Sequence, residues 1–188
     1  MINPSGTGCL TLQSLTLSRQ TYDPWYRMLI SQLGWFIDVY GHAWHYSTPA
    51  SLLTMVLLMA HVYRTRYQRE WLLMVILLMI GWVVEFLLLR SHLIIYVGTA
   101  PNSLWPPIWV LLLWPLFGIL LPVWQQKMTT LPWQILMGFL CPLAYAAGAH
   151  AGAAILPHPA YDFCMMSILW SCLLPALLGL SRHFSLAR

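Results

Sequence analysis

Two carboxylates lie inside stretches of the chain that are otherwise apolar. Glu85 is the one ionisable residue in residues 71–89, and Asp38 lies in residues 28–46 together with His42 and His45. An ionisable group inside a membrane is costly and therefore suggests a function. Such a carboxyl can relay protons or hydrogen-bond a ligand, or it can join helices through Arg90, a tryptophan N–H or a backbone group. Both interpretations stay open for Glu85 and Asp38.

The pair His42 and His45 places two imidazoles on adjacent helical turns, a spacing that can share a metal ion. No HExxH motif or carboxylate-rich set accompanies the pair. Two interfacial histidines are therefore favoured over a metal site, and no metal or cofactor is predicted. No glycine-rich phosphate loop, nucleophile elbow or Ser/His/Asp order is visible either.

The composition excludes a soluble globular protein. Hydrophobic residues make up 60% of the chain and charged residues 7%, whereas soluble domains carry about 25% charged residues. The net charge of +4 contains no basic run, so no nucleic-acid partner is expected. The four cysteines show no CxxC spacing, and no disulfide is expected.

The apolar segments predict an all-α membrane protein, a polytopic bundle of six transmembrane helices. About 20 helical residues cross a hydrocarbon core of about 30 Å. The first span is the weakest because it contains Asp38, and the alternative is five spans with that segment on the membrane surface. Met28 begins this span and is a second candidate translation start beside Met1. The expected spans are residues 28–46, 48–63, 71–89, 104–124, 131–155 and 163–180, with a disordered cytoplasmic tail at 1–27 and a cytoplasmic tail at 182–188.

The cations predict the orientation of these spans. Six spans place eight cations on one side of the membrane and only Arg90 on the other. Because cytoplasmic loops are enriched in Lys and Arg, both termini are expected in the cytoplasm. His61 and His183 then lie at cytoplasmic ends and are expected to snorkel to the interface or to be solvated. The eight cations are Arg19, Arg27, Arg64, Arg66, Arg69, Lys127, Arg182 and Arg188.

This orientation gathers polar residues in the outer half of the membrane. They form the candidate functional cluster of Asp38, His42, His45, Glu85, Arg90 and His150. In the fifth span, Ala144, Gly148 and Gly152 recur at intervals of four, a small-residue row that lets another helix approach closely. Packing within the bundle is the favoured use of this row, and a homodimer contact is the alternative.

Three motifs carry a family resemblance. They are QLGWF at residues 32–36, PPIWVLLLWPLF at 106–117 and PLAYAAGAHAGA at 142–153. They resemble the bacterial membrane-protein family catalogued as domain of unknown function 2878, over about residues 29–180. In that family an Asp typically follows a Gly in the third segment, so Gly81 and Glu85 look like the equivalents. The end of the fourth segment, LLPVWQQK, and Arg90-Ser91-His92 depart from the pattern.

The resemblance implies the architecture, a place in the inner membrane of a bacterium and no established activity, although members often look encoded near lipid-modifying genes. Three function classes therefore remain open. The favoured class is a non-catalytic component that binds a lipid-like or apolar molecule, or a partner enzyme, through an outer-leaflet cavity lined by spans one, three and five. The alternatives are a lipid-modifying enzyme that uses Glu85 or Asp38, and a small proton-coupled transporter.

Overall fold

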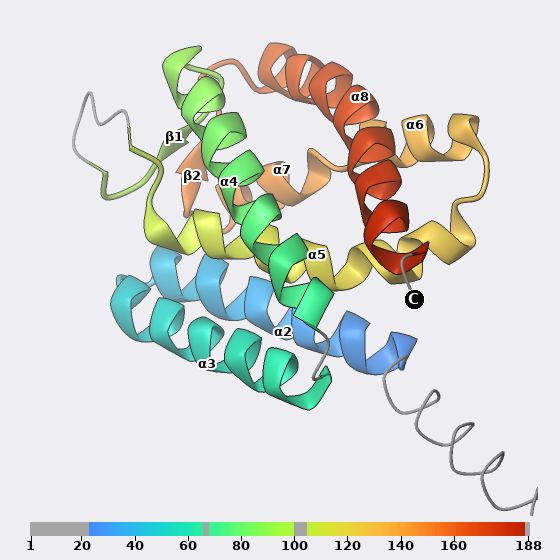
Figure 1. Ribbon diagram of the computed structural model, residues 1–188. Helices are drawn as coiled ribbons and strands as arrows, with labels where there is room; N and C mark the ends of the chain where they lie inside the picture. The colour runs from blue at the N-terminus through green and yellow to red at the C-terminus, as the bar shows by residue number, and fades with distance from the viewer. Residues whose placement is uncertain (1–22, 66–67, 100–104, 187–188) are drawn as a thin grey trace, which may run out of the picture.

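The computed structural model describes residues 23–65, 68–99 and 105–186, and these residues form an all-helical fold with one short two-stranded sheet (Figure 1). The predicted all-α class is therefore confirmed. The elements are α2 (Pro24–Ala43), α3 (Ser47–Thr65), α4 (Gln68–Arg90), β1 (Ile95–Tyr96), α5 (Ile108–Lys127), α6 (Leu131–Leu140), α7 (Leu143–His150), β2 (Ala154–Ile155) and α8 (Pro159–Leu186).

Successive helices run back and forth along the bundle, with α6 and α7 forming one bent rod. The start of α2 and the end of α8 lie at the same end of the molecule (Figure 1). The opposite end carries the antiparallel strand pair, in which Ile95 faces Ile155 and Tyr96 faces Ala154.

Four helical stretches are long and apolar enough to cross a membrane: Glu70–Arg90, Ile108–Lys127, Leu131–His150 and Pro159–Phe184. These stretches match predicted spans three to six. α2 and α3 match predicted spans one and two in position, but they are not among the four.

Helix α5 is the centre of the bundle. It packs against α2, α3, α4 and α8, while α6 packs mainly against α8. The side chains of Trp114, Leu116, Ile119 and Leu121 on α5 are almost completely buried. This burial fits a helix that is hydrophobic on all sides and enclosed by other helices.

Helix α2 begins at Pro24, four residues before the predicted start of the first span. The Asp23 side chain accepts a hydrogen bond from the Trp25 backbone N–H at 3.1 Å, and Pro24 stands in the first turn. Both features favour a helix start. The predicted disordered tail 1–27 is therefore wrong for Pro24–Arg27, and residues 1–22 lie outside the described part of the chain.

The fifth predicted span is interrupted. Residues 131–155 are not one helix, because α6 ends at Leu140, α7 begins at Leu143, and the helical structure stops at His150. Pro142 between them has no N–H for the helical hydrogen bond and its ring crowds the preceding turn. Gly152 then adopts a φ of +90°, which glycine tolerates best, and leads the chain into β2.

The last helix is longer than expected at both ends. The predicted sixth span covers residues 163–180 with a separate tail from 182, whereas α8 extends from Pro159 to Leu186. The Asp162 carboxylate accepts a hydrogen bond from the His158 backbone N–H at 2.7 Å, which links the preceding loop to the first turn of the helix. Ser181 near its end hydrogen-bonds Gln125 of α5 at 3.2 Å.

A buried ion cluster joins the ends of α2, α3 and α4 that lie on the side of the chain termini. The Arg27 guanidinium donates to the Glu70 carboxylate and also to the Ile119 carbonyl at 3.2 Å. His61 lies 3.3 Å from the same carboxylate and has no exposed surface. The prediction that His61 is solvated is therefore wrong, because its ring fills the space between Glu70 and the stacked ring of Tyr26.

Candidate functional site

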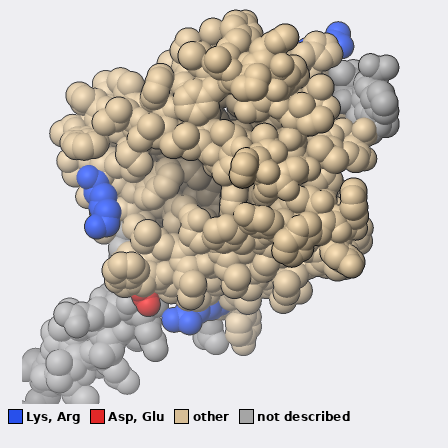
Figure 2. Space-filling view, turned by 180° about the vertical axis from the view of Figure 1, so that it is seen from behind, with Lys and Arg blue, Asp and Glu red and all other residues tan. Residues whose placement is uncertain are grey.

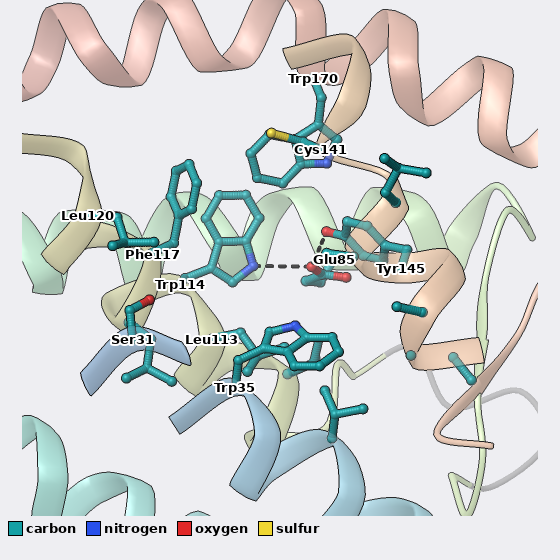
Figure 3. A pocket seen from close by; sticks show the side chains of 18 of the residues that line it. Ser31, Trp35, Glu85, Leu113, Trp114, Phe117, Leu120, Cys141, Tyr145 and Trp170 are labelled. Atoms are coloured by element: carbon teal, nitrogen blue, oxygen red, sulfur yellow. Dashed lines mark hydrogen bonds between the residues drawn. The ribbon is translucent and has the colours of Figure 1, made fainter. Parts of the chain in front are cut away.

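A cavity of about 580 Å³ lies between α2, α5 and the bent rod α6–α7 (Figure 3). Seen from the back of the bundle, the surface is hollowed and carries charged side chains only near its edges (Figure 2). The lining residues come mainly from α2 (Ser31, Gln32, Trp35, Val39), α5 (Trp109, Val110, Leu113, Trp114, Leu116, Phe117, Leu120, Trp124) and α6–α7 (Met137, Leu140, Cys141, Leu143, Ala144, Tyr145, Ala147, Gly148), with Glu85, Ile94, Tyr96, Ala154 and Trp170 closing the far wall.

Glu85 is the polar centre of the far wall. Its carboxylate accepts hydrogen bonds from the Tyr145 hydroxyl at 2.7 Å, from the Trp114 indole N–H at 3.1 Å and from the Tyr96 hydroxyl. Only 1% of the residue is exposed. A buried carboxylate with three donors is compensated by hydrogen bonds rather than by a cation. We call Glu85, Tyr96, Trp114 and Tyr145 the Glu85 cluster.

Four different elements bring the Glu85 cluster together. Gly81 stands one helical turn before Glu85 on α4, and a Cβ there would collide with the Trp114 ring. The missing side chain therefore lets the indole approach α4. Strand β1 places Tyr96, and the break at Pro142 starts the short helix α7 that carries Tyr145. The cluster depends on tertiary contacts between segments that are 11 to 60 residues apart.

The remainder of the wall is aromatic and aliphatic. Trp114 stacks on Trp170 at a centroid distance of 5.4 Å, and Phe117 meets the edge of Trp170 at 5.6 Å. Trp35 and Ser31 project from α2 on the opposite side (Figure 3). Among the described lining residues there is no Lys or Arg. An apolar wall with few polar groups is typical of a small-molecule site.

Of the six residues in the predicted cluster, Glu85 is the one that lines the cavity. Asp38 is fully buried in the interface of α2 with α3, where Thr54 faces it. Neither of its carboxylate oxygens has a hydrogen-bond partner within the described part of the chain. Asp38 and Glu85 therefore belong to different places in the fold.

The other four predicted residues do not gather around Glu85. His42 hydrogen-bonds the Val97 carbonyl at 2.5 Å and stacks on Trp109 at 4.6 Å, just outside the cavity. His45 follows the end of α2 in a left-handed turn with a φ of +64° and is exposed. Arg90 and His150 are also exposed. A helix turns about 100° per residue, so Arg90, five positions after Glu85, points to a different side of α4.

The arrangement of His42 and His45 does not form a shared metal site. His42 turns into the protein while His45 leaves the helix and faces outward. Across residues 23–65, 68–99 and 105–186, no group of three or more His, Cys, Asp or Glu side chains is placed to hold a metal ion.

The predicted packing row on the fifth span is wrong for contacts within the bundle. A Cβ added to Gly148 or Gly152 would meet no described atom within 4 Å. Ala144 and Gly148 line the cavity instead. The close helix approach occurs at Gly138 of α6, where a Cβ would collide with the backbone of Trp170 and Ser171 on α8.

The sequence offered a tryptophan N–H as one partner for Glu85, which Trp114 is, but it did not identify Tyr96 or Tyr145. The three motifs nevertheless contain most of the wall. QLGWF supplies Gln32 and Trp35, PPIWVLLLWPLF supplies Trp114 and its neighbours, and PLAYAAGAHAGA supplies Tyr145. A tryptophan or tyrosine in a membrane protein usually suggests an interfacial anchor. The signal that could have found Trp114 and Tyr145 is their place inside the motifs rather than at segment ends, whereas Tyr96 lies outside the motifs.

Comparison with known proteins gives one result. No curated protein and no solved structure matches the chain. A family model matches residues 24–176, which include every described residue of the cavity wall. The chain belongs to the family described as "Protein of unknown function (DUF2878)".

Proposed function

We propose that this protein is a six-span protein of the bacterial inner membrane that binds a lipid-like or apolar molecule in the cavity without transforming it. The observation that supports this most is the cavity itself: about 580 Å³, walled by aromatic and aliphatic side chains. Its volume falls within the range of about 300–1,000 Å³ that small-molecule sites have. All three family motifs contribute to its wall.

The surfaces of α2 and α3 support six spans rather than four. Their outward sides are apolar, with Leu29 66% exposed on α2 and Met59 69% exposed on α3. Six of their polar residues are buried in the bundle instead: Arg27, Ser31 and Asp38 on α2, and Ser51, Thr54 and His61 on α3. A helix in lipid has this pattern, with polar residues facing the bundle and apolar residues facing outward. These inward polar residues lower the mean hydropathy of both helices.

Exposed aromatic residues stand at both ends of the α2–α3 hairpin, as interfacial anchors do. Trp25 and Tyr63 lie at the end that carries the termini, and Trp44 and Tyr46 lie at the turn. The cations support cytoplasmic termini, because Arg64, Lys127 and Arg182 lie at one end of the bundle and Arg90 at the other.

A non-catalytic role is favoured by the state of Glu85. Three donors of the protein already bind three of the about four lone-pair positions of its carboxylate, whereas a general acid or base must have its proton-transfer position directed at a substrate. Glu85 therefore fits a role in holding Tyr96, Trp114 and Tyr145 at the wall. The cavity lies between α2 and α6–α7, two elements with outward faces that are apolar, so a ligand from the bilayer has an apolar route of entry.

The proposed function can be tested by a substitution that fills the cavity with a larger side chain. Gly148→Leu adds a side chain at a cavity position where a Cβ meets no described atom, and Gly179→Leu makes the same change in open space on α8, outside the wall. Wild-type protein purified in mild detergent is expected to retain lipid-like molecules, detected by native mass spectrometry and solvent extraction. Gly148→Leu should retain several-fold less, and Gly179→Leu should match the wild type. Equal retention by all three proteins would refute binding in the cavity.

A further inference from the structure

We infer that the ligand is an uncharged long-chain molecule that ends in a hydroxyl group, and that this hydroxyl binds at the Glu85 cluster. The inference rests on the proposed function and specifies the chemical class of its ligand. It follows from the charges of the wall, from the hydrogen-bonding positions that the protein leaves unused, and from the shape of the cavity.

The charges of the wall exclude an anionic head group. The described lining contains the Glu85 carboxylate and no Lys or Arg. A phosphate or carboxylate head group would lose its hydration on entering and would meet a carboxylate instead of a cation. Phospholipids and fatty acids are therefore poor ligands for this site.

The hydrogen bonds of the cluster specify what the head group must offer. The Tyr96 and Tyr145 hydroxyls and the Trp114 N–H all donate to Glu85. A carboxylate has about four lone-pair positions, and a phenolic oxygen that donates its proton can still accept one. The unused capacity within the Glu85 cluster is therefore that of an acceptor, which a donor on the ligand can fill. The buried indole N–H groups of Trp109 and Trp170 in the same wall have no acceptor within the described residues, so the ligand must also bring an acceptor.

A second group faces the cluster from the other side of the cavity. Figure 3 draws Trp35 of α2 across from Glu85 and Tyr145, with its ring nitrogen on the edge turned toward them. An indole N–H is a donor only. A ligand group placed between the two sides must then accept from Trp35 and donate to Tyr145 or Glu85. A hydroxyl does both, whereas an ester only accepts and an ammonium group only donates.

The remainder of the cavity fits an apolar chain. From Trp114 the wall continues along α5 through Phe117 to Leu120, with Leu113 and Trp35 on the side of α2 (Figure 3). Aromatic and aliphatic surfaces bind an apolar chain by removing it from contact with polar groups. The Ser31 hydroxyl is the polar group that the figure places farthest along this path.

The test compares four probes that share one chain and differ in the head group: oleyl alcohol, methyl oleate, oleate and oleylamine. Each is titrated into delipidated full-length protein in detergent, and binding is measured by native mass spectrometry. Oleyl alcohol is expected to bind about tenfold more tightly than methyl oleate, which corresponds to about 1.4 kcal/mol, and more tightly than either charged probe. Equal affinities, or a preference for oleate, oleylamine or the ester, would overturn the inference.

A matched pair of variants locates the hydroxyl. Tyr145→Phe removes the phenolic oxygen and keeps the ring, and Tyr40→Phe makes the same change on the outer side of α2, beside Phe36. Tyr145→Phe should remove the preference for the alcohol over the ester, and Tyr40→Phe should keep it. A preserved preference in Tyr145→Phe would place the hydroxyl elsewhere.

These outcomes separate the two proposals. If no probe binds and Gly148→Leu retains as much lipid as the wild type, the proposed function fails. If all four probes bind equally and Gly148→Leu blocks them, the cavity binds ligand and only the head-group inference fails. The probe comparison uses wild-type protein, so it decides the inference even if Tyr145→Phe does not fold.

Discussion

At the scale of single residues, Glu85 is the buried carboxyl group on which the far wall of the cavity depends. Its carboxylate accepts from three aromatic side chains that come from β1, α5 and α7. The hydrogen bonds therefore fix both the position of the acid and the orientation of the rings that shape the wall. Asp38 shows the contrast, because it is equally buried but accepts no hydrogen bond within the described residues.

Replacing Glu85 should destabilise the protein more than replacing its neighbours does. Glu85→Ala leaves three donors without an acceptor, and each unsatisfied buried group costs about 1–3 kcal/mol. We expect a loss of at least about 3 kcal/mol in the free energy of unfolding, measured by denaturant titration in detergent. Val83→Ala, at a side chain that is 47% exposed on the same helix, should cost about 0.5 kcal/mol. Similar losses in both variants would contradict the assigned role of Glu85.

At the scale of elements, the helices are joined differently at the two ends of the bundle. The end with the strand pair is joined by β1 and β2 and by the His42 contact with Val97. The end with the termini is joined by Arg27, His61 and Glu70, which connect α2, α3 and α4. Between these ends α2 and α6–α7 stand on opposite sides of the cavity, so the cavity is held open by contacts made elsewhere.

The ion cluster should contribute much more than an exposed cation at the same end. Arg27→Met leaves the Glu70 carboxylate with His61 alone, and breaking a buried ion pair costs about 3–5 kcal/mol. Arg64→Met removes an exposed guanidinium that lies 4.1 Å above the Tyr26 ring, an interaction of about 0.5–1 kcal/mol. Chemical unfolding followed by tryptophan fluorescence compares the two. If Arg64→Met is the more damaging variant, the buried cluster is not what joins these helices.

At the scale of the whole molecule, the surface has the polarity expected of a protein embedded in lipid. Large apolar side chains are exposed along α2, α3, α4 and α6, while Asp38, Glu85, His61 and Thr54 are buried. A soluble protein keeps contiguous exposed apolar patches small. In the proposed six-span arrangement with cytoplasmic termini, these exposed apolar side chains face the lipid.

The topology can be tested by labelling introduced cysteines in a background where the natural cysteines are replaced. Ser91 and Thr129 are both exposed and follow the ends of α4 and α5, at opposite ends of the bundle. An impermeant thiol reagent should label Ser91→Cys on intact cells, and Thr129→Cys only after the membrane is permeabilised. The reverse pattern would place the termini outside the cell, and labelling of both on intact cells would exclude spans that alternate as proposed.

The sequence by itself determined the all-α class and the approximate positions of the helical segments, including the four that are long and apolar enough to cross a membrane. These follow from the lengths of apolar runs, because each span must satisfy its backbone groups within its own helix. It also identified Glu85 as unusual, because a lone carboxylate in nineteen apolar residues is visible without a structure. The family was recognisable for the same reason, from local motifs that the family model covers.

The tertiary structure decided which polar residues meet. The sequence grouped Asp38, His42, His45, Glu85, Arg90 and His150 by their predicted depth in the membrane. Depth does not specify the direction in which a side chain points, and that direction depends on where each helix turns, breaks and packs. The break at Pro142 and the absent side chain of Gly81 brought Tyr145 and Trp114 to Glu85. The aromatic cavity results from those contacts between distant segments, which no local sequence pattern predicts.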